Sequence, residues 1–284
     1  MKRFLVFLLL CSILLPCFGC AGTPAQAEIV ATTLPVYEFT SRLCRDTGLS
    51  VTRLVTESVS CLHDYSLSVR QVKAIEGAQV IVLSGGGLED FMTDALSGCE
   101  RVINSSHGIS LNDHHEHAHG EDPHIWLSPE NAKAMATNIC RSLTEIYPQH
   151  NALFTENLNS LIAELDALES YGEQQLSDLS CRQLITFHDG FHYLAETFEL
   201  EILKAVEEES GSEASAMELK ELTYLIREND LPAIFTERSG SVSAAGILSA
   251  ETGVQVYSLD MAMAGSSYFE AMYHNIDTLK EALG

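Results

Sequence analysis

The chain has 284 residues, with 40 Asp and Glu against 16 Lys and Arg, and its formal net charge is −24 at pH 7. So acidic a protein is poorly suited to nucleic-acid binding, because phosphate recognition needs clustered Lys and Arg. The length is sufficient for two domains with hydrophobic cores of their own.

The N-terminus has the features of a secretory signal. Lys2 and Arg3 precede the apolar run "FLVFLLLCSILL", which is too short to span a bilayer. The following "PCFGCAG" resembles a bacterial lipobox, although Cys17 stands where leucine is usual. We therefore expect residues 1–20 to be a signal peptide, with Cys20 lipidated and the protein anchored outside the bacterial cell membrane. The alternative is ordinary cleavage near "AGTPAQA", which would give a soluble periplasmic or secreted protein.

Five cysteines remain after this processing, an odd number that leaves at least one thiol outside any intramolecular disulfide. The sequence does not define the pairing. Cys61 lies two residues before a histidine, so it is either a soft metal ligand or, as we expect, a buried or disulfide-bonded cysteine. The five are Cys44, Cys61, Cys99, Cys140 and Cys181.

The first half of the mature chain alternates short β-branched runs with amphipathic stretches. We predict strands at 28–33, 51–56, 79–85 and 101–104, and helices at 36–46, 66–77 and 88–98. This alternation is typical of a mostly parallel sheet flanked by helices. The run "SGGG" at 84–87 lacks the Lys-Ser/Thr of a phosphate-binding loop, so we interpret it as a tight turn between a strand and a helix.

The second half repeats the pattern. Strands are predicted at 182–187, 200–206, 231–237 and 254–260, and a last amphipathic helix at 268–283. Between the two sets, 131–146 and 151–176 have helical periodicity, and the second would extend about 39 Å. The fold class is therefore α/β: two lobes, each with a mostly parallel sheet flanked by helices, joined by one long helix. The predicted boundaries are 27–148 and 179–284 for the lobes and 149–178 for the linker helix.

Four residues with metal-binding side chains follow predicted strands, two in each lobe. In folds of this kind, the loops after the carboxyl ends of the strands carry the binding site. The side chains of these residues are therefore expected to face one cleft between the lobes. The residues are His63, His124, His188 and Asp260.

A second group of histidines lies in "DHHEHAHGEDPH" at 113–124. His115, Glu116 and His119 match the His-Glu-x-x-His motif of zinc hydrolases, which requires a helix. Gly108, Gly120 and Pro123 flank a run without an apolar face, so a helix is not expected. The favoured hypothesis is an accessory loop that gathers zinc weakly through four histidines: His114, His115, His117 and His119.

Four segments occur in an order that resembles a known family: "LHDYSLSVRQVKAIEGAQVIVLSGGGLEDF", "EDPHIWLSPENA", "ITFHDGFHYLAETF" and "YSLDMAMAG". They look like the ZnuA/TroA-like (cluster A-I) solute-binding lipoproteins of bacterial zinc and manganese ABC importers. The resemblance covers nearly all of the mature chain. It implies two α/β lobes tied by one long helix, with a single metal ion held between them.

The resemblance also implies the ligands. The family's three side-chain ligands fall on His63, His124 and His188, and the fourth position, a carboxylate or water, falls on Asp260. Three imidazoles suit tetrahedral Zn²⁺, whereas Mn²⁺ prefers oxygen-rich sites. Zinc is thus the expected cargo, and a manganese-carrying member is the alternative. "MAMAG" after Asp260 replaces the usual "PLG", which leaves the geometry there open.

Several neighbours of these residues have two interpretations each. Asp64, Asp122 and Asp189 either orient the adjacent imidazoles or point away from them. Glu237 lines the cleft or forms a salt bridge elsewhere. His192, four residues after His188, is an extra ligand or, as we expect, a hydrogen-bonding histidine.

The expected function is that of a carrier rather than an enzyme. The protein would capture Zn²⁺ outside the membrane as a monomer and deliver it to the permease of an ABC importer. A zinc hydrolase using His115, Glu116 and His119 is the alternative from a different class.

Overall fold

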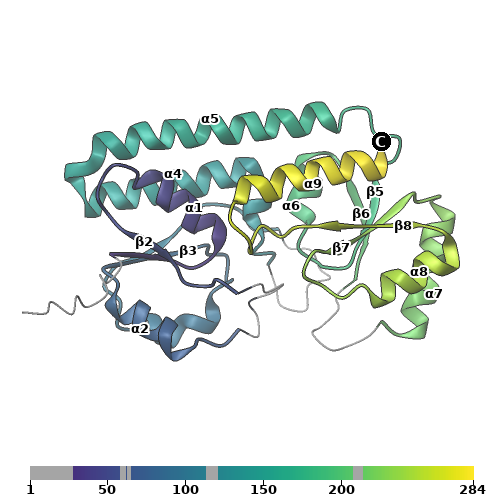
Figure 1. Ribbon diagram of the computed structural model, residues 1–284, viewed down its shortest axis with the longest axis horizontal. Coiled ribbons are helices and arrows are strands. Elements are labelled where there is room, and N and C mark those ends of the chain that lie inside the picture. The colour runs from purple at the N-terminus through teal and green to yellow at the C-terminus, as the bar shows by residue number, and fades with distance from the viewer. Residues whose placement is uncertain (1–27, 58–61, 63–64, 113–120, 207–213) are drawn as a thin grey trace, which may run out of the picture.

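The strands of the chain form two separate parallel sheets, one in each half of the sequence. The computed structural model describes residues 28–57, 62, 65–112, 121–206 and 214–284. The predicted signal segment, including Cys20, lies outside these residues. Within them, the two sheets lie side by side along the longest axis of the molecule, and helices cover their faces (Figure 1). The predicted α/β class with two lobes is confirmed.

The N-terminal sheet has the strand order β2-β1-β3-β4, with every neighbouring pair parallel. Its central strands β1 and β3 are buried almost completely, as expected for β-branched runs with helices on both faces. The elements are β1 (Ile29–Ala31), α1 (Leu34–Leu43), β2 (Val51–Arg53), α2 (Val69–Gly77), β3 (Val80–Leu83), the 3-10 turn η1 (Asp90–Met92), α3 (Thr93–Leu96) and β4 (Val102–Asn104).

The C-terminal sheet repeats this topology with the order β6-β5-β7-β8, again all parallel. Helix α7 begins with a capping box, in which the Ser215 hydroxyl and the Glu218 side chain each accept a backbone N–H of the other residue. The elements are β5 (Gln183–Thr186), α6 (His192–Thr197), β6 (Glu201–Ala205), α7 (Ala216–Glu228), β7 (Ala233–Glu237), α8 (Ser243–Thr252), β8 (Gln255–Leu259) and α9 (Tyr268–Leu283).

One predicted helix, at 88–98, is wrong. The segment forms only η1 and the single-turn α3, because the chain before it is held in a turn. The buried carboxylate of Glu89 accepts hydrogen bonds from the amides of Ser84 and Gly85 and from the Thr32 hydroxyl. Gly85 has φ of +86°, and a Cβ atom there would lie 2.0 Å from Asn104 Oδ1, so the turn requires glycine.

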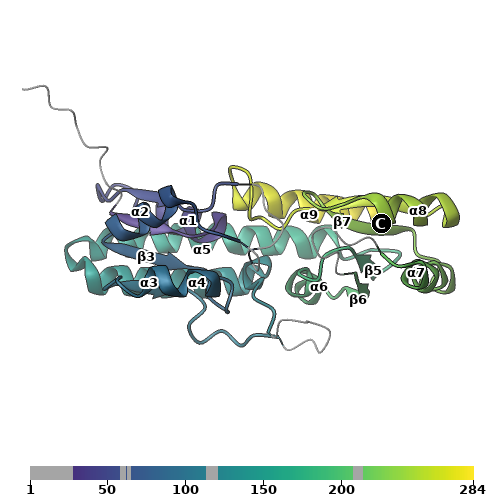
Figure 2. The ribbon, with the colours of Figure 1, turned by 90° about the horizontal axis from the view of Figure 1, so that it is seen from below.

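One long helix, α5 (Asn151–Gln175), connects the two lobes. It follows three elements that come after β4: η2 (Ile125–Leu127), α4 (Pro129–Ile146) and η3 (Pro148–His150). Helix α5 passes over both lobes, as Figures 1 and 2 show. It packs on α1 and α4 of the N-terminal lobe and on α9 of the C-terminal lobe. Its buried Leu161, Leu165 and Leu168 recur on one helical face and join a hydrophobic core that includes residues of both lobes.

The described cysteines carry free thiols. Cys44 and Cys140 are buried, and Cys99 and Cys181 are partly exposed. Burial raises the pKa of Cys44 to about 12, so this thiol stays protonated and packs as a small apolar side chain. No helix in the described ranges is long and apolar enough to cross a membrane.

Candidate functional site between the lobes

The residues predicted to bind metal lie where strands end. His188 comes two residues after β5, and Asp260 follows β8 directly. His124 follows β4 at the end of a long connection and opens the 3-10 turn η2. His63 lies outside the described residues. Of the four predicted ligands, the structure therefore describes three, and it brings His124 and His188 from different lobes together.

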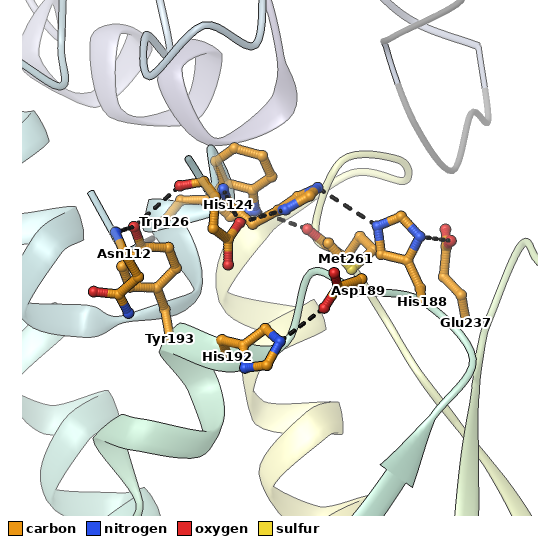
Figure 3. Close-up of polar contacts among 10 residues, drawn as sticks. Asn112, His124, Trp126, His188, Asp189, His192, Tyr193, Glu237 and Met261 are labelled. Atoms are coloured by element: carbon orange, nitrogen blue, oxygen red, sulfur yellow. Dashed lines mark hydrogen bonds and ion pairs between the residues drawn. The ribbon is translucent and has the colours of Figure 1, made fainter. Parts of the chain in front are cut away.

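The two imidazoles meet through their Nε2 atoms, which are 3.5 Å apart (Figure 3). The rings are nearly perpendicular, with centroids 5.2 Å apart. His124 is 3% exposed and His188 is 18% exposed, so the pair is largely shielded from water. Two nitrogens directed at one point can act as donors to a shared cation.

His124 is fixed by Asp122, which is completely buried. Asp122 Oδ1 lies 2.7 Å from His124 Nδ1 and accepts the backbone N–H of His124 at 2.9 Å. A proton on Nδ1 that is donated to this carboxylate leaves the Nε2 lone pair available. Of the two interpretations of Asp122, the structure favours orientation of the imidazole.

His188 has a corresponding carboxylate in Glu237, the last residue of β7. Glu237 Oε2 lies 3.7 Å from His188 Nδ1, so the same pattern occurs on the second lobe at a longer distance. Burial, together with the nearby charge of Asp260, raises the pKa of Glu237 to about 7. Glu237 therefore lines the site.

Gly190 leaves the space that the His188 ring occupies. A Cβ atom at this position would lie 2.9 Å from His188 Nε2 and 2.7 Å from Met261 Cε. Both distances are too short for ordinary packing. The sequence shows this glycine in "FHDGFH", but nothing local indicates that its missing side chain makes room for an imidazole.

The carboxylate of Asp260 is held by its own lobe. Oδ1 accepts the amide of Ala262 at 2.8 Å, and Oδ2 lies 3.3 Å from Arg238 Nη1. Asn275 fixes the backbone on both sides, since its Oδ1 accepts the Asp260 amide and its Nδ2 donates to the Asp260 carbonyl. Ala262 has φ of +55°, a left-handed conformation that residues other than glycine rarely adopt.

His192 has the hydrogen-bonding role that we expected. Its Nε2 lies 2.7 Å from Asp189 Oδ1 at the start of α6. Burial alone would lower the pKa of His192, but the hydrogen bond to Asp189, together with the negative charges of Asp189, Asp122 and Glu196, raises it above its ordinary value. Asp189 thus orients His192, whereas the adjacent His188 is oriented by Glu237 from another strand.

Among the residues that the structure describes, no group of three or more His, Cys, Asp or Glu side chains is arranged to hold a metal ion. The described centre is a pair of imidazoles with supporting carboxylates. The other predicted donors lie outside the described residues: His63 with its neighbours Asp64 and Cys61, and the tract of His114, His115, Glu116, His117 and His119.

Comparison with known proteins gives consistent results over almost the whole chain. The zinc-binding lipoprotein AdcA of Streptococcus pneumoniae is 29% identical over 305 aligned residues, covering 99% of this chain and 60% of AdcA. The high-affinity zinc uptake system protein ZnuA of Bacillus subtilis is 27% identical, covering 96% of this chain and 95% of that protein. The chain therefore spans less than two thirds of AdcA but nearly all of ZnuA.

A solved structure of the Zn(II)-bound AdcA from Streptococcus pneumoniae superposes with a TM-score of 0.79 at 28% identity, covering 91% of this chain and 58% of that one. The model of the family described as "Zinc-uptake complex component A periplasmic" matches residues 29–282. This match includes both sheets, the connecting helix and both imidazoles of the centre. The chain belongs to the ZnuA family of substrate-binding proteins for metal uptake.

Proposed function

We propose that this protein is an extracytoplasmic solute-binding protein that captures one Zn²⁺ ion between its lobes and delivers it to an ABC importer. The proposed ligands are His63, His124 and His188, with Asp260 or water in the fourth position. The observation that carries the proposal is the meeting of two Nε2 atoms from different lobes, 3.5 Å apart, each on a ring whose Nδ1 faces a carboxylate.

The choice of zinc over manganese rests on the donor atoms. Imidazole nitrogens in a tetrahedral arrangement suit Zn²⁺, whereas Mn²⁺ prefers carboxylate, carbonyl and water oxygens in octahedral geometry. The described donors at the lobe boundary are two imidazoles, and the family description and the AdcA and ZnuA relatives support the same metal. A manganese-carrying protein is the less favoured alternative.

The charge of the site fits a carrier. Three neutral imidazoles and one carboxylate around Zn²⁺ leave a net charge of +1, which reduces the cost of holding a divalent ion in a partly dry cleft. With Asp260 in the fourth position, no coordination site stays open for a reacting water, as hydrolysis would require. We therefore propose a binding function and no catalytic one. The hydrolase alternative would need Glu116, and replacing Glu116 by Gln should leave zinc capture unchanged.

The location follows from the N-terminus. We propose that Cys20 carries the lipid anchor after removal of residues 1–19 and that the protein works as a monomer at the outer face of the cell membrane. The lipoprotein AdcA supports an anchored form. We also propose that the His-rich tract binds additional zinc loosely through His114, His115, His117 and His119.

A zinc titration of the soluble mature domain, residues 21–284, against a chromophoric chelator tests this function. We expect one tight equivalent of Zn²⁺, and loss of that equivalent in His124→Ala and His188→Ala. His107→Ala is the matched control, because His107 is exposed and should leave the tight site unchanged. Retention of the tight equivalent in both cleft variants would rule out the proposed site.

A further inference from the structure

The segment from Asp122 to Trp126, called here the His124 segment, belongs to the N-terminal lobe but is held by the C-terminal lobe at both ends. His124 lies in its middle. Figure 3 shows Tyr193 on one side of this segment and Met261 on the other. The contacts at each end are hydrogen bonds between buried groups, for which the cost of losing a partner is largest.

At the Asp122 end, the contact is made by Tyr193 of α6. Its hydroxyl donates to the Asp122 carbonyl at 3.0 Å and accepts the amide of Asn112 at 2.9 Å. The Asp122 amide also donates to the Asn112 carbonyl at 3.0 Å. One phenol from the second lobe thus fixes two loop segments of the first, directly where Asp122 presents its carboxylate to His124.

At the Trp126 end, two groups of the second lobe take part. The Trp126 indole Nε1 donates to the Met261 carbonyl at 2.8 Å, next to Asp260. The Trp126 carbonyl accepts from the Tyr268 hydroxyl of α9, also at 2.8 Å. Both aromatic rings are fully buried, so these bonds are shielded from water.

We infer that Tyr193 and Tyr268 are positioning residues, which hold the His124 segment from the opposite lobe and thereby aim Nε2 of His124 at the bound metal. The inference rests on the proposed function. Its consequence concerns release: separating the lobes removes His188 from the ion and, in the same movement, breaks the hydrogen bonds that hold His124 and its carboxylate in position. Lobe separation therefore lowers metal affinity more than the loss of His188 alone would, because the orientation of His124 is lost as well.

Substitution of each tyrosine by phenylalanine tests this role, because it removes only the hydroxyl. In Tyr193→Phe and in Tyr268→Phe, we expect Zn²⁺ to dissociate about 3- to 10-fold faster, the factor that corresponds to one net hydrogen bond. The matched control is Tyr171→Phe, whose hydroxyl bonds Asp277 on the surface of α5 and α9 and should leave the dissociation rate unchanged. Rates are measured by transfer of zinc to excess chelator.

Two further measurements separate positioning from general stability. The visible absorption of bound Co²⁺ reports ligand geometry and should change in Tyr193→Phe and Tyr268→Phe at full saturation. Amide hydrogen exchange at Asn112 should accelerate in Tyr193→Phe. Wild-type dissociation rates and Co²⁺ spectra in both variants would overturn the inference while leaving the carrier function intact. Absence of a tight site in the wild type would overturn the carrier function itself.

Discussion

Two ring nitrogens define the centre of this protein, and each depends on a carboxylate on the far side of its ring. Asp122 is buried and bonds His124 at 2.7 Å, whereas Glu237 lies 3.7 Å from His188. An imidazole whose Nδ1 faces a carboxylate is fixed in orientation and is a better electron donor at Nε2. The two supporting carboxylates come from different lobes, as the histidines do.

Glu237→Gln should therefore weaken zinc binding without removing a ligand. The amide keeps the size of the side chain but removes the negative charge that supports His188. We expect zinc affinity to fall about 10-fold, at the lower end of what loss of such an outer partner costs. A competition titration measures this, with the exposed Glu221→Gln as the control. Equal affinities in the two variants would show that Glu237 does not support His188.

Gly190→Ala should displace the His188 ring, because the added methyl group would lie 2.9 Å from Nε2. We expect a decrease in zinc affinity of about 10-fold or more, comparable to losing an orienting partner. Gly246→Ala in α8 is the matched control, since a Cβ atom there meets nothing within 4 Å. Unchanged affinity in Gly190→Ala would mean that the ring has another position from which it binds.

At the scale of helices and strands, α5 determines how the lobes sit relative to each other. It packs on helices of both lobes, and Gly172 lies where α5 meets the C-terminal lobe. A Cβ atom at Gly172 would be 2.3 Å from the ring of Phe198 and 3.2 Å from Ile276 Cδ1. Glycine at this position therefore lets α5 pack closely against Phe198 and Ile276, and its role is not to make the helix flexible.

Gly172→Ala is expected to destabilise the protein despite the better helix propensity of alanine. Overpacking in a filled interior costs about 1–3 kcal/mol, and an alanine in a helix gains up to about 1 kcal/mol. Gly246→Ala has the gain without the clash, so the free energy of unfolding should differ between the two variants by about 1–3 kcal/mol. Urea denaturation of both proteins measures this difference, and equal stabilities would contradict the packing argument.

The elements of both sheets were predictable from the sequence because each buried strand is a β-branched run bounded by turn residues. The helix predicted at 88–98 failed for a reason that no local pattern reveals. Glu89 looks like a surface helix residue, but its carboxylate is buried and bonds the turn before it. Long-range burial here overrides local propensity.

At the scale of the whole molecule, His124 and His188 come together from chain segments that follow strands of different sheets, β4 and β5. The rule that binding sites follow the carboxyl ends of strands predicted that His124 and His188 would face each other, and their Nε2 atoms lie 3.5 Å apart. The rule could not identify Gly190, Tyr193 or Met261, since their roles arise only when the lobes pack together. Tyr193 and Met261 contact the His124 segment across the lobe boundary, and Gly190 lies against the His188 ring within one turn. No sequence motif indicates these contacts.

Deletion of residues 113–119 should leave the tight site intact. The Asp122 amide donates to the Asn112 carbonyl, so the deletion would join these residues by Gly120 and Glu121 and convert their hydrogen bond into that of a four-residue β-turn. We expect one tight zinc to remain and only weaker binding to disappear, measured by equilibrium dialysis at increasing zinc concentration. Loss of the tight zinc would instead show that the tight site depends on the deleted histidines of the tract.

The most direct test of the central claim is a crystal structure of the zinc-loaded protein with diffraction data measured on both sides of the zinc absorption edge. We predict one strong anomalous peak between the lobes, about 2.0–2.1 Å from Nε2 of His124 and Nε2 of His188, with His63 as the third nitrogen ligand. A principal peak in the tract at 114–119, with none between the two imidazoles, would contradict it.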